Sequence, residues 1–317
     1  MISSTRSSPA LLAAALLLGG CAGAPLGLPP APAVELTAVP FFPQTDYQCG
    51  PAALATVLAH AGAPVAADDL VAEVYVAGLR GSLQPELLGA TRRNGLIPYV
   101  LAPEPGALLA ELAGGRPVLV LQNLGLPRAP VWHYAVVVGT EGDRVILRSG
   151  TEQRRLEPSA KFLRTWQRGA NWAFVAVEPG ELPATATAPA YVRALAGAEP
   201  LLAAPQAAAA YAAALARWPN DELVLFAAAG HKLALRDSVG ATALYRQLLA
   251  TAPQNAAARN NLANVLAERG CYADALREAR AALTRVAADD ELYGAISATV
   301  AEIENSAGSS VAAAACP

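Results

Sequence analysis

The hydrophobic pattern changes its period partway along the chain: apolar residues first recur every three or four positions, which is the spacing of a helix face. The segments with this spacing are 51–61, 68–76, 85–93 and 106–113. Further on, short β-branched runs bounded by glycine, proline or charged residues predict strands. These runs are 118–121, 134–138, 145–147 and 172–177. Helices followed by an antiparallel sheet indicate an α+β domain, which we place at 36–180.

The C-terminal part of the chain is helical in pattern and repeats every 34 residues. The positions that keep this register are Ala207, Ala241 and Ala275; Tyr211, Tyr245 and Ala279; Ala214, Leu248 and Ala282; and Pro219, Pro253 and Ala287. Thirty-four residues is the tetratricopeptide period, in which a small residue lies where two helices cross and a proline closes the unit. We therefore predict an all-α tetratricopeptide-repeat domain at 188–305, after a linker at 181–187. A generic alanine-rich bundle is the alternative.

The N-terminus has the pattern of an export signal. A polar segment with one cation, Arg6, precedes an apolar run at 10–18. About nine apolar residues are too few to cross a bilayer core but suit a signal peptide. The run ends in the sequence LGGC at 18–21, which resembles the bacterial lipoprotein signal. The resemblance implies lipidation of Cys21 and cleavage before it, whereas an ordinary secretory signal cut just after the cysteine is the alternative.

This interpretation divides the N-terminal segment and assigns a location. The signal peptide covers 1–20, a Pro/Ala-rich tether covers 21–35, and a flexible tail covers 306–317. Ala22, rather than Asp, follows the lipidated cysteine, which favours delivery to an outer membrane. We expect an exported protein that is lipid-anchored to the bacterial cell envelope on the periplasmic side, with the lipid as its only membrane contact.

Charge and cysteine content narrow the possible partners. The net charge of -3, from 23 basic and 26 acidic residues, offers no footprint for nucleic acid. Of the four cysteines, Cys21 and Cys49 have proposed roles, and an oxidising compartment would allow Cys271 and Cys316 to pair. No CxxC or Cys/His spacing typical of a metal site occurs, so we expect no metal and no cofactor.

Cys49, directly before a predicted helix, is the main candidate for chemistry. Pro51 starts that helix, and Gly50 lets a substrate backbone approach closely. The positive end of the helix dipole and its unpaired N–H groups favour the thiolate, which is the reactive form. Gln44 can donate its amide N–H to a tetrahedral intermediate beside the Cys49 N–H, and such a donor is worth about 3 kcal/mol. A buried structural thiol is the alternative.

A base for this thiol must be one of three histidines. His60 follows Cys49 on the same helix and lies about 16 Å away along the axis, which is out of reach. His231 lies in the repeats, and we expect it on a helix surface. His133 remains, at the head of a predicted strand, and we assign it as the general base. Its alternative role is an aromatic pair with Trp132 at a strand edge.

The group that orients His133 should lie on the next strand. A hairpin folded about Glu141 puts residue 149 opposite residue 133, with the register uncertain by one. Ser149 stands there, and its hydroxyl can accept the imidazole N–H but stabilises an imidazolium poorly. A Cys–His dyad, with Asn123 or Asn171 as weak substitutes, therefore stays open.

These segments together resemble the bacteriocin-processing (double-glycine leader) cysteine peptidases of papain-like fold, and more narrowly their lipoprotein branch with tetratricopeptide repeats. The resemblance covers about 38–178 and is carried by residues 44, 49–54, 114–118 and 133–137. It implies Cys49 as nucleophile, His133 as base and Gln44 as oxyanion donor. The glutamine stands five residues before the cysteine where six is usual, so Gln48 could supply the donor. The family's aspartate after the histidine falls at Ser149.

We therefore expect a membrane-anchored cysteine peptidase. It would hydrolyse peptide bonds of envelope peptides or proteins through a Cys49 thioester, while the repeats bind a protein partner. Two alternatives stay open. One is a catalytically inactive papain-like/repeat scaffold, which Ser149 favours, and the other is a transpeptidase that uses the same thiol.

Overall fold

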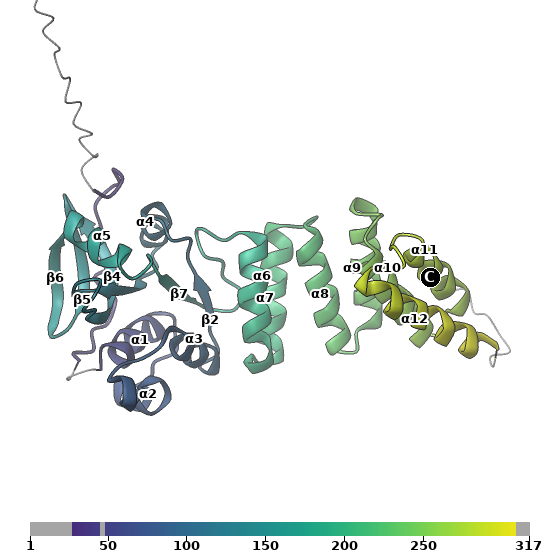
Figure 1. Ribbon diagram of the computed structural model, residues 1–317, viewed down its shortest axis with the longest axis horizontal. Coiled ribbons are helices and arrows are strands. Elements are labelled where there is room, and N and C mark those ends of the chain that lie inside the picture. The colour runs from purple at the N-terminus through teal and green to yellow at the C-terminus, as the bar shows by residue number, and fades with distance from the viewer. Residues whose placement is uncertain (1–26, 45–47, 309–317) are drawn as a thin grey trace, which may run out of the picture.

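The computed structural model describes residues 27–44 and 48–308, and Figure 1 shows their arrangement. The predicted signal peptide, Cys21, Cys316 and most of the predicted tail lie outside these residues, so what we infer about them stays a prediction. Cys271 is disulfide-bonded. Within the described ranges, no helix is both long and apolar enough to cross a membrane.

The α+β part is built on one antiparallel sheet with the strand order β2-β7-β3-β4-β5-β6, and β1 pairs with β4. The strands are β1 (Val34–Glu35), β2 (Ile97–Val100), β3 (Val118–Asn123), β4 (Trp132–Glu141), β5 (Arg144–Ser149), β6 (Glu152–Pro158) and β7 (Ala173–Val177). The four predicted strands are confirmed as β3, β4, β5 and β7. The α+β prediction is therefore correct for this part of the chain.

The sequence pattern missed the two strands at the ends of the sheet. β2 contains Pro98, and β6 has the sequence EQRRLEP, so neither has the apolar alternation of a half-buried strand. Both lie at the two ends of the strand order. Proline and charged side chains are typical of edge strands, where they discourage pairing with another chain. The same composition hides such strands from a search for hydrophobic periodicity.

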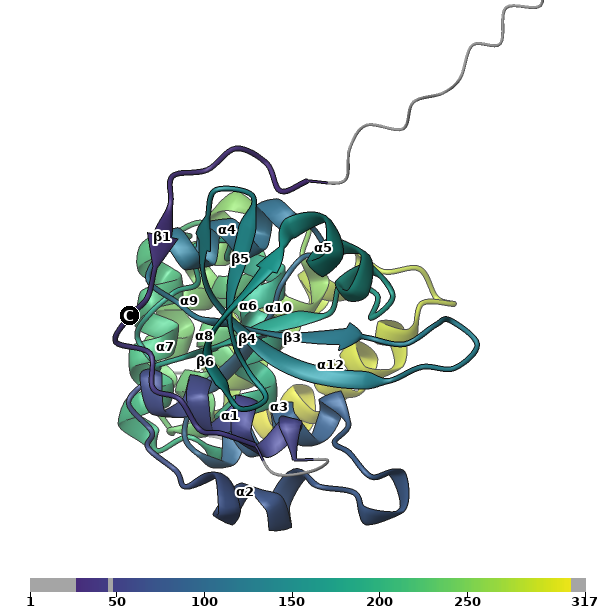
Figure 2. The same cartoon turned by 90° about the vertical axis from the view of Figure 1, so that its left-hand side faces the viewer.

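Helices cover both faces of the sheet (Figure 2). One face carries α1 (Cys49–His60), α2 (Ala67–Val74) and α3 (Gln84–Arg93), and the short η1 (Ala77–Leu79) connects α2 to α3. The other face carries α4 (Pro105–Ala113) and α5 (Ser159–Gln167). The alternation along β4 assigns its faces. Tyr134 and Val136 pack in the core with α1, whereas Ala135 and Val137 pack in the core with α4 and α5.

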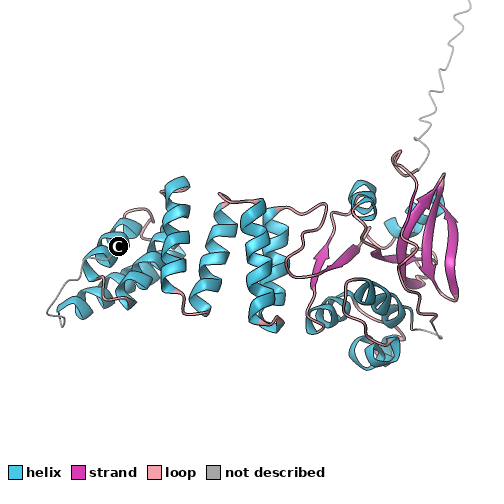
Figure 3. Cartoon of the chain, turned by 180° about the vertical axis from the view of Figure 1, so that it is seen from behind, coloured by secondary structure: helices cyan, strands magenta, loops and turns pink. Residues whose placement is uncertain are grey.

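A row of helices extends away from the β2 end of the sheet (Figure 3). The strands therefore lie in one half of the molecule, and the row forms the other half. The helices are α6 (Ala188–Ala198), η2 (Glu199–Leu201), α7 (Ala204–Arg217), α8 (Glu222–Ala234), α9 (Ser238–Thr251), α10 (Ala256–Glu268), α11 (Tyr272–Leu283) and α12 (Glu291–Gly308). The first three positions of the 34-residue register lie on α7, α9 and α11, and all nine of these residues are buried. That the helix pairs are tetratricopeptide repeats stays a prediction.

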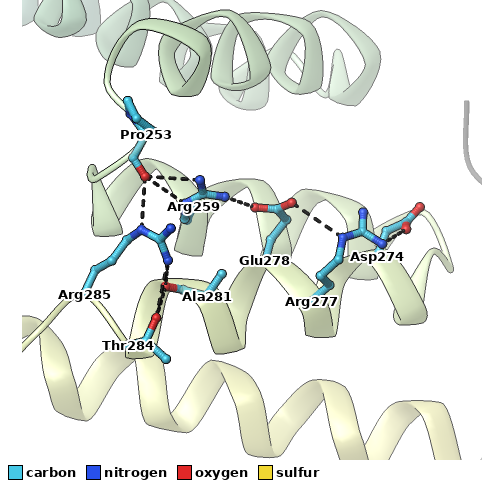
Figure 4. Close-up of polar contacts among 8 residues, drawn as sticks. All are labelled: Pro253, Arg259, Asp274, Arg277, Glu278, Ala281, Thr284 and Arg285. Atoms are coloured by element: carbon cyan, nitrogen blue, oxygen red, sulfur yellow. Dashed lines mark hydrogen bonds and ion pairs between the residues drawn. The ribbon is translucent and has the colours of Figure 1, made fainter.

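The fourth register position, the closing proline, is used as a hydrogen-bond acceptor. The carbonyl of Pro253 accepts from Arg259 and Arg285, and Arg259 also pairs with Glu278 (Figure 4). At the equivalent position 34 residues earlier, the carbonyl of Pro219 accepts from the side chain of Gln247 at 2.9 Å. These bonds attach each inter-helix turn to a helix that follows it in the row.

The helical row shares its core with the sheet. Residues of β2 and β7 pack in one cluster with residues of α6, α7 and α8, including Tyr191 and Tyr211. The segment 181–187 between the two parts is held by hydrogen bonds: the buried carboxylate of Glu111 accepts from the N–H groups of Ala184 and Thr185. The helices therefore continue from a firmly attached segment.

His231 is buried, and our prediction that it lies on a helix surface was wrong. Its Nδ1 lies 2.6 Å from Oε1 of Glu199, and its ring stacks on Tyr211 with centroids 4.6 Å apart. The Tyr211 hydroxyl donates to the other Glu199 oxygen at 2.7 Å. A helix inside a row is covered on more than one side, so a polar position facing a neighbouring helix can be enclosed.

Candidate active site

Cys49 is the first residue of α1, which begins two residues before the predicted start at Pro51. Gly50 is required there for packing. A Cβ at this position would lie 2.3 Å from the Ser82 hydroxyl oxygen, which no real Cβ tolerates. We had explained the glycine by substrate approach alone. The structure adds a close contact between the start of α1 and the segment before α3.

The Cys49 thiol is surrounded by backbone donors but is desolvated. Burial raises the pKa of this thiol, and the backbone N–H groups of Tyr134, Gly50 and Cys49 itself offset only part of that effect. The thiolate that we expected from the helix terminus is thus not the resting form at neutral pH. Desolvation outweighs the favourable N–H groups because α1 is packed against the sheet. The hydrogen bond from the Tyr134 N–H places the Cys49 sulfur next to β4, one residue after His133.

His133, the second residue of β4, is a neutral imidazole at physiological pH. Burial lowers its pKa to about 4; the cation of Arg155 lowers it further, and the carboxylate of Glu157 raises it. Its Nε2 lies 2.8 Å from the Ser149 hydroxyl oxygen. In the described part of the chain this is the only hydrogen bond of the ring, so Nδ1 is left to accept a proton. The thiol and the imidazole share no hydrogen bond there.

Ser149 reaches His133 by a different register from the one we predicted. The hairpin turns at residues 142–143, with Glu141 opposite Arg144, and a bulge follows between Val137 and Gly139. Because Val136 pairs with Arg148, the next step puts Ser149 opposite residue 135 rather than 133. Residues 133 and 135 share one face of β4, so the His133–Ser149 contact is diagonal.

The two asparagines that we kept as substitutes for Ser149 bind elsewhere. Oδ1 of Asn123 accepts from the N–H groups of Gly125 and Val131, 3.0 Å from each, and so closes the loop between β3 and β4. Nδ2 of Asn171 donates to the Pro103 carbonyl at 2.9 Å. Ser149 is therefore the side chain that contacts the imidazole.

Gln44 lies beside the end of β5, where its backbone N–H donates to the Gly150 carbonyl at 3.1 Å. A pocket lies at this junction. Its lining residues are Phe41, Phe42, Gln44, Cys49, Ala52, Ala53, Thr56, Tyr134, Arg148, Ser149 and Gly150. Three of the four predicted catalytic side chains thus surround one pocket, and His133 is attached to it through Ser149.

A polar network behind His133 was absent from our sequence interpretation. Gln122 pairs with His133 across β3 and β4, and its amide donates to the Thr165 hydroxyl at 2.7 Å and to Glu157 at 3.4 Å. The Glu157 carboxylate is buried and lies 2.8 Å from Lys161 Nζ. The signal in the sequence was a glutamine ending the apolar run VLVLQN of β3.

His60 lies away from the pocket. His60 ends α1, and its Nε2 lies 3.0 Å from the Gly115 carbonyl oxygen, at the opposite end of the helix from Cys49. In 27–44 and 48–308, no group of three or more His, Cys, Asp and Glu side chains is arranged to hold a metal.

No family model matches this chain, and no curated protein matches it. Solved structures similar to it include a C39-like peptidase from Bacillus anthracis, at 19% identity and a TM-score of 0.39, over 47% of this chain and 98% of that one. A double glycine motif protease from an AMS/PCAT transporter, in complex with the leader peptide, has 20% identity and a TM-score of 0.35, over 45% and 96%. The peptidase domain of Streptococcus ComA, a bi-functional ABC transporter, has 20% identity and a TM-score of 0.37, over 44% and 98%. At these values the likeness carries no argument about function, which depends on the site.

Proposed function

We propose that the chain is a cysteine peptidase in which Cys49 is the nucleophile and His133 is the general base. The observation that carries this proposal is the pocket at which Cys49, Gln44 and Ser149 meet, with the imidazole bonded to Ser149. A thiol at a helix start, an imidazole on the adjacent strand and an amide donor nearby are the groups that acyl transfer requires.

The reaction would proceed through a thioester. His133 Nδ1 takes the Cys49 proton as the sulfur attacks the peptide carbonyl carbon. The resulting oxyanion accepts hydrogen bonds from the Cys49 N–H and the Gln44 amide. The imidazolium then protonates the leaving amine as the C–N bond breaks. Water, deprotonated by His133, attacks the thioester, and the thiol is released with the carboxylic acid product.

The pKa directions determine how the first proton moves. Because the thiol pKa is raised and the imidazole pKa is lowered, the resting pair is neutral rather than a thiolate–imidazolium ion pair. Proton transfer then accompanies the attack on the carbonyl instead of preceding it. The imidazole also has to turn Nδ1 toward the sulfur, a tightening that catalytic contacts commonly undergo when substrate binds.

Ser149 has a positioning role in this scheme. When its oxygen accepts from Nε2–H, the proton stays on Nε2, and Nδ1 keeps the lone pair that the thiol needs. A hydroxyl lacks the negative charge that would stabilise the imidazolium, and this agrees with the low pKa of His133. We therefore infer a slower enzyme than one with a carboxylate at position 149.

The setting of the reaction is part of the same proposal. The LGGC signal supports a lipid anchor on Cys21 and action on peptides or proteins of the cell envelope. The helical row supports a protein-binding role for α8–α12, because stacked helix pairs present an extended surface.

A non-catalytic scaffold is the second candidate. Two observations favour it: the serine at position 149 and the neutral resting pair of Cys49 and His133. In that case, the pocket would bind a peptide without cleaving it.

Cleavage of a peptide library, followed by mass spectrometry, separates the two. The protein is the full chain with Cys21→Ser, compared with Cys49→Ala and with His60→Ala as a matched control on the same helix. A peptidase loses cleavage in Cys49→Ala and keeps it in His60→Ala. Cleavage at the wild-type rate in Cys49→Ala would end the peptidase proposal, and peptide binding without cleavage by the wild type would support the scaffold. Added amines that appear in the product would indicate a transpeptidase.

A further inference from the structure

Arg148 is a buried cation beside the nucleophile. It precedes Ser149 on β5, is only 5% exposed, and lines the pocket that also contains Cys49 and Gln44. Ile146, two residues earlier on the same strand, packs in the core with α1, and the Arg148 guanidinium donates to the carbonyl of Val39, which belongs to that core.

The hydrogen bonds of Arg148 leave its buried Nε–H unused. Nη1 donates to the Gln153 carbonyl and Nη2 to the Val39 carbonyl, but Nε is buried without a hydrogen-bond partner. Arg148 also forms no ion pair with any carboxylate of residues 27–44 or 48–308. The carboxylate of Glu35 acts on it from a distance, but that group is held by Arg154 through two hydrogen bonds of 2.8 and 2.9 Å.

A purely structural role does not account for this arrangement. Two carbonyl contacts could be made by an uncharged amide, whereas a buried guanidinium that pairs with no carboxylate among the described residues is strongly disfavoured by desolvation. A ligand that brings a negative charge would satisfy both the charge and the unused Nε–H.

We propose that Arg148 binds a carboxylate of the ligand that enters the Cys49 pocket. The carboxylate is the C-terminal α-carboxylate of a short peptide or an acidic side chain close to the bond attacked by Cys49. That the ligand is a peptide rests on the proposed function, but the anion site itself does not. Phe41 and Phe42 also line the pocket, so water would be displaced on binding and the charge-assisted hydrogen bond would be strengthened.

Protection of Cys49 from alkylation tests this site without requiring turnover. The full chain with Cys21→Ser is treated with iodoacetamide, which is neutral, and the Cys49 peptide is quantified by mass spectrometry. N-acetylglycine is compared with N-acetylglycinamide for the α-carboxylate. N-acetylaspartic acid α-amide is compared with N-acetylasparagine amide for the side-chain carboxylate. Arg148→Gln removes the charge, and Arg144→Gln is the matched control, an exposed arginine of the same strand that does not line the pocket.

In one of the two acid/amide pairs, we expect the acid to protect Cys49 from alkylation about tenfold better than the amide does. A charged hydrogen bond contributes about that factor in affinity. Arg148→Gln should abolish the preference and Arg144→Gln should keep it. Equal protection by acid and amide in the wild type, or a preference that survives Arg148→Gln, would refute the proposal. If Arg148→Gln fails to fold, two other measurements test the proposal. The wild type must be protected better by the acid than by its amide, and Arg148→Lys, which retains the charge, must keep that preference. A chain that shows the preference but cleaves no peptide would refute the peptidase and leave the carboxylate site standing.

Discussion

Two histidines in different regions of this molecule make opposite kinds of contact: His133 is half-buried, and His231 is buried. His133, the second residue of β4, bonds a neutral hydroxyl, and its Nδ1 is left to react. His231, in the helical row, bonds the carboxylate of Glu199 and stacks on Tyr211. The comparison teaches that burial alone does not indicate catalysis. What distinguishes the catalytic candidate is a weak partner and an adjacent pocket.

Replacing His133 gives the largest expected effect on this comparison. His133→Ala should reduce peptide cleavage about 10³-fold, because the general base for Cys49 is lost. The melting temperature should change far less than the rate. Steady-state kinetics with a peptide found in the library screen provide the measurement. Unchanged kcat in His133→Ala would remove the distinction between the two histidines.

The pH dependence of stability should report on His133 as well. Its folded pKa of about 4 lies below the value of about 6.5 in the unfolded chain, so the unfolded state binds more protons between these values. The free energy of unfolding should therefore fall by about 3 kcal/mol as the pH is lowered from about 6.5 to about 4. Urea unfolding across this range, with His133→Gln as the reference, measures the contribution. A variant with the same slope as the wild type would assign the effect to other groups.

His231→Leu tests the helical histidine. The substitution removes the contacts to Glu199 and leaves that carboxylate with the Tyr211 hydroxyl alone, so we expect a loss of about 2 kcal/mol in stability. Cleavage by the sheet part should stay at the wild-type rate at a temperature where both proteins are folded. A drop in kcat larger than the change in folded fraction would contradict a purely structural His231.

Ser149→Asp should have the smallest effect and the opposite sign. A carboxylate in contact with Nε2 would raise the His133 pKa and stabilise the imidazolium, giving about a tenfold gain in cleavage near neutral pH. The pH–rate profile is the measurement, and its acidic limb should move to higher pH. Ser149→Ala is the control and should be slower than the wild type. An unchanged profile in Ser149→Asp would show that Ser149 does not act through the imidazole.

The candidate site was only partly predictable. Cys49, His133 and Ser149 were predicted by residue type, by position relative to expected elements and by a family resemblance. The structure places Ser149 in contact with His133 and in the pocket that Cys49 lines. The predicted register of Ser149 was wrong because the turn lies at 142–143 and a bulge follows it. Neither feature leaves a hydrophobic signal. Gln122 and Arg148 escaped notice because a single polar residue in a strand has the same pattern whether it is buried or exposed.

The sequence by itself determined what depends on neighbouring residues: a helix that begins close to Cys49, the four apolar strands and the 34-residue register of the helices. Only the tertiary structure decided the edge strands, the enclosure of His231, the diagonal contact to Ser149 and the burial of Arg148. The reason is that periodicity arises from residues a few positions apart, whereas desolvation depends on segments far apart in the chain that pack together. Desolvation also reversed our expectation for the thiol, because the packing of α1 on the sheet outweighs the helix terminus that a sequence can reveal.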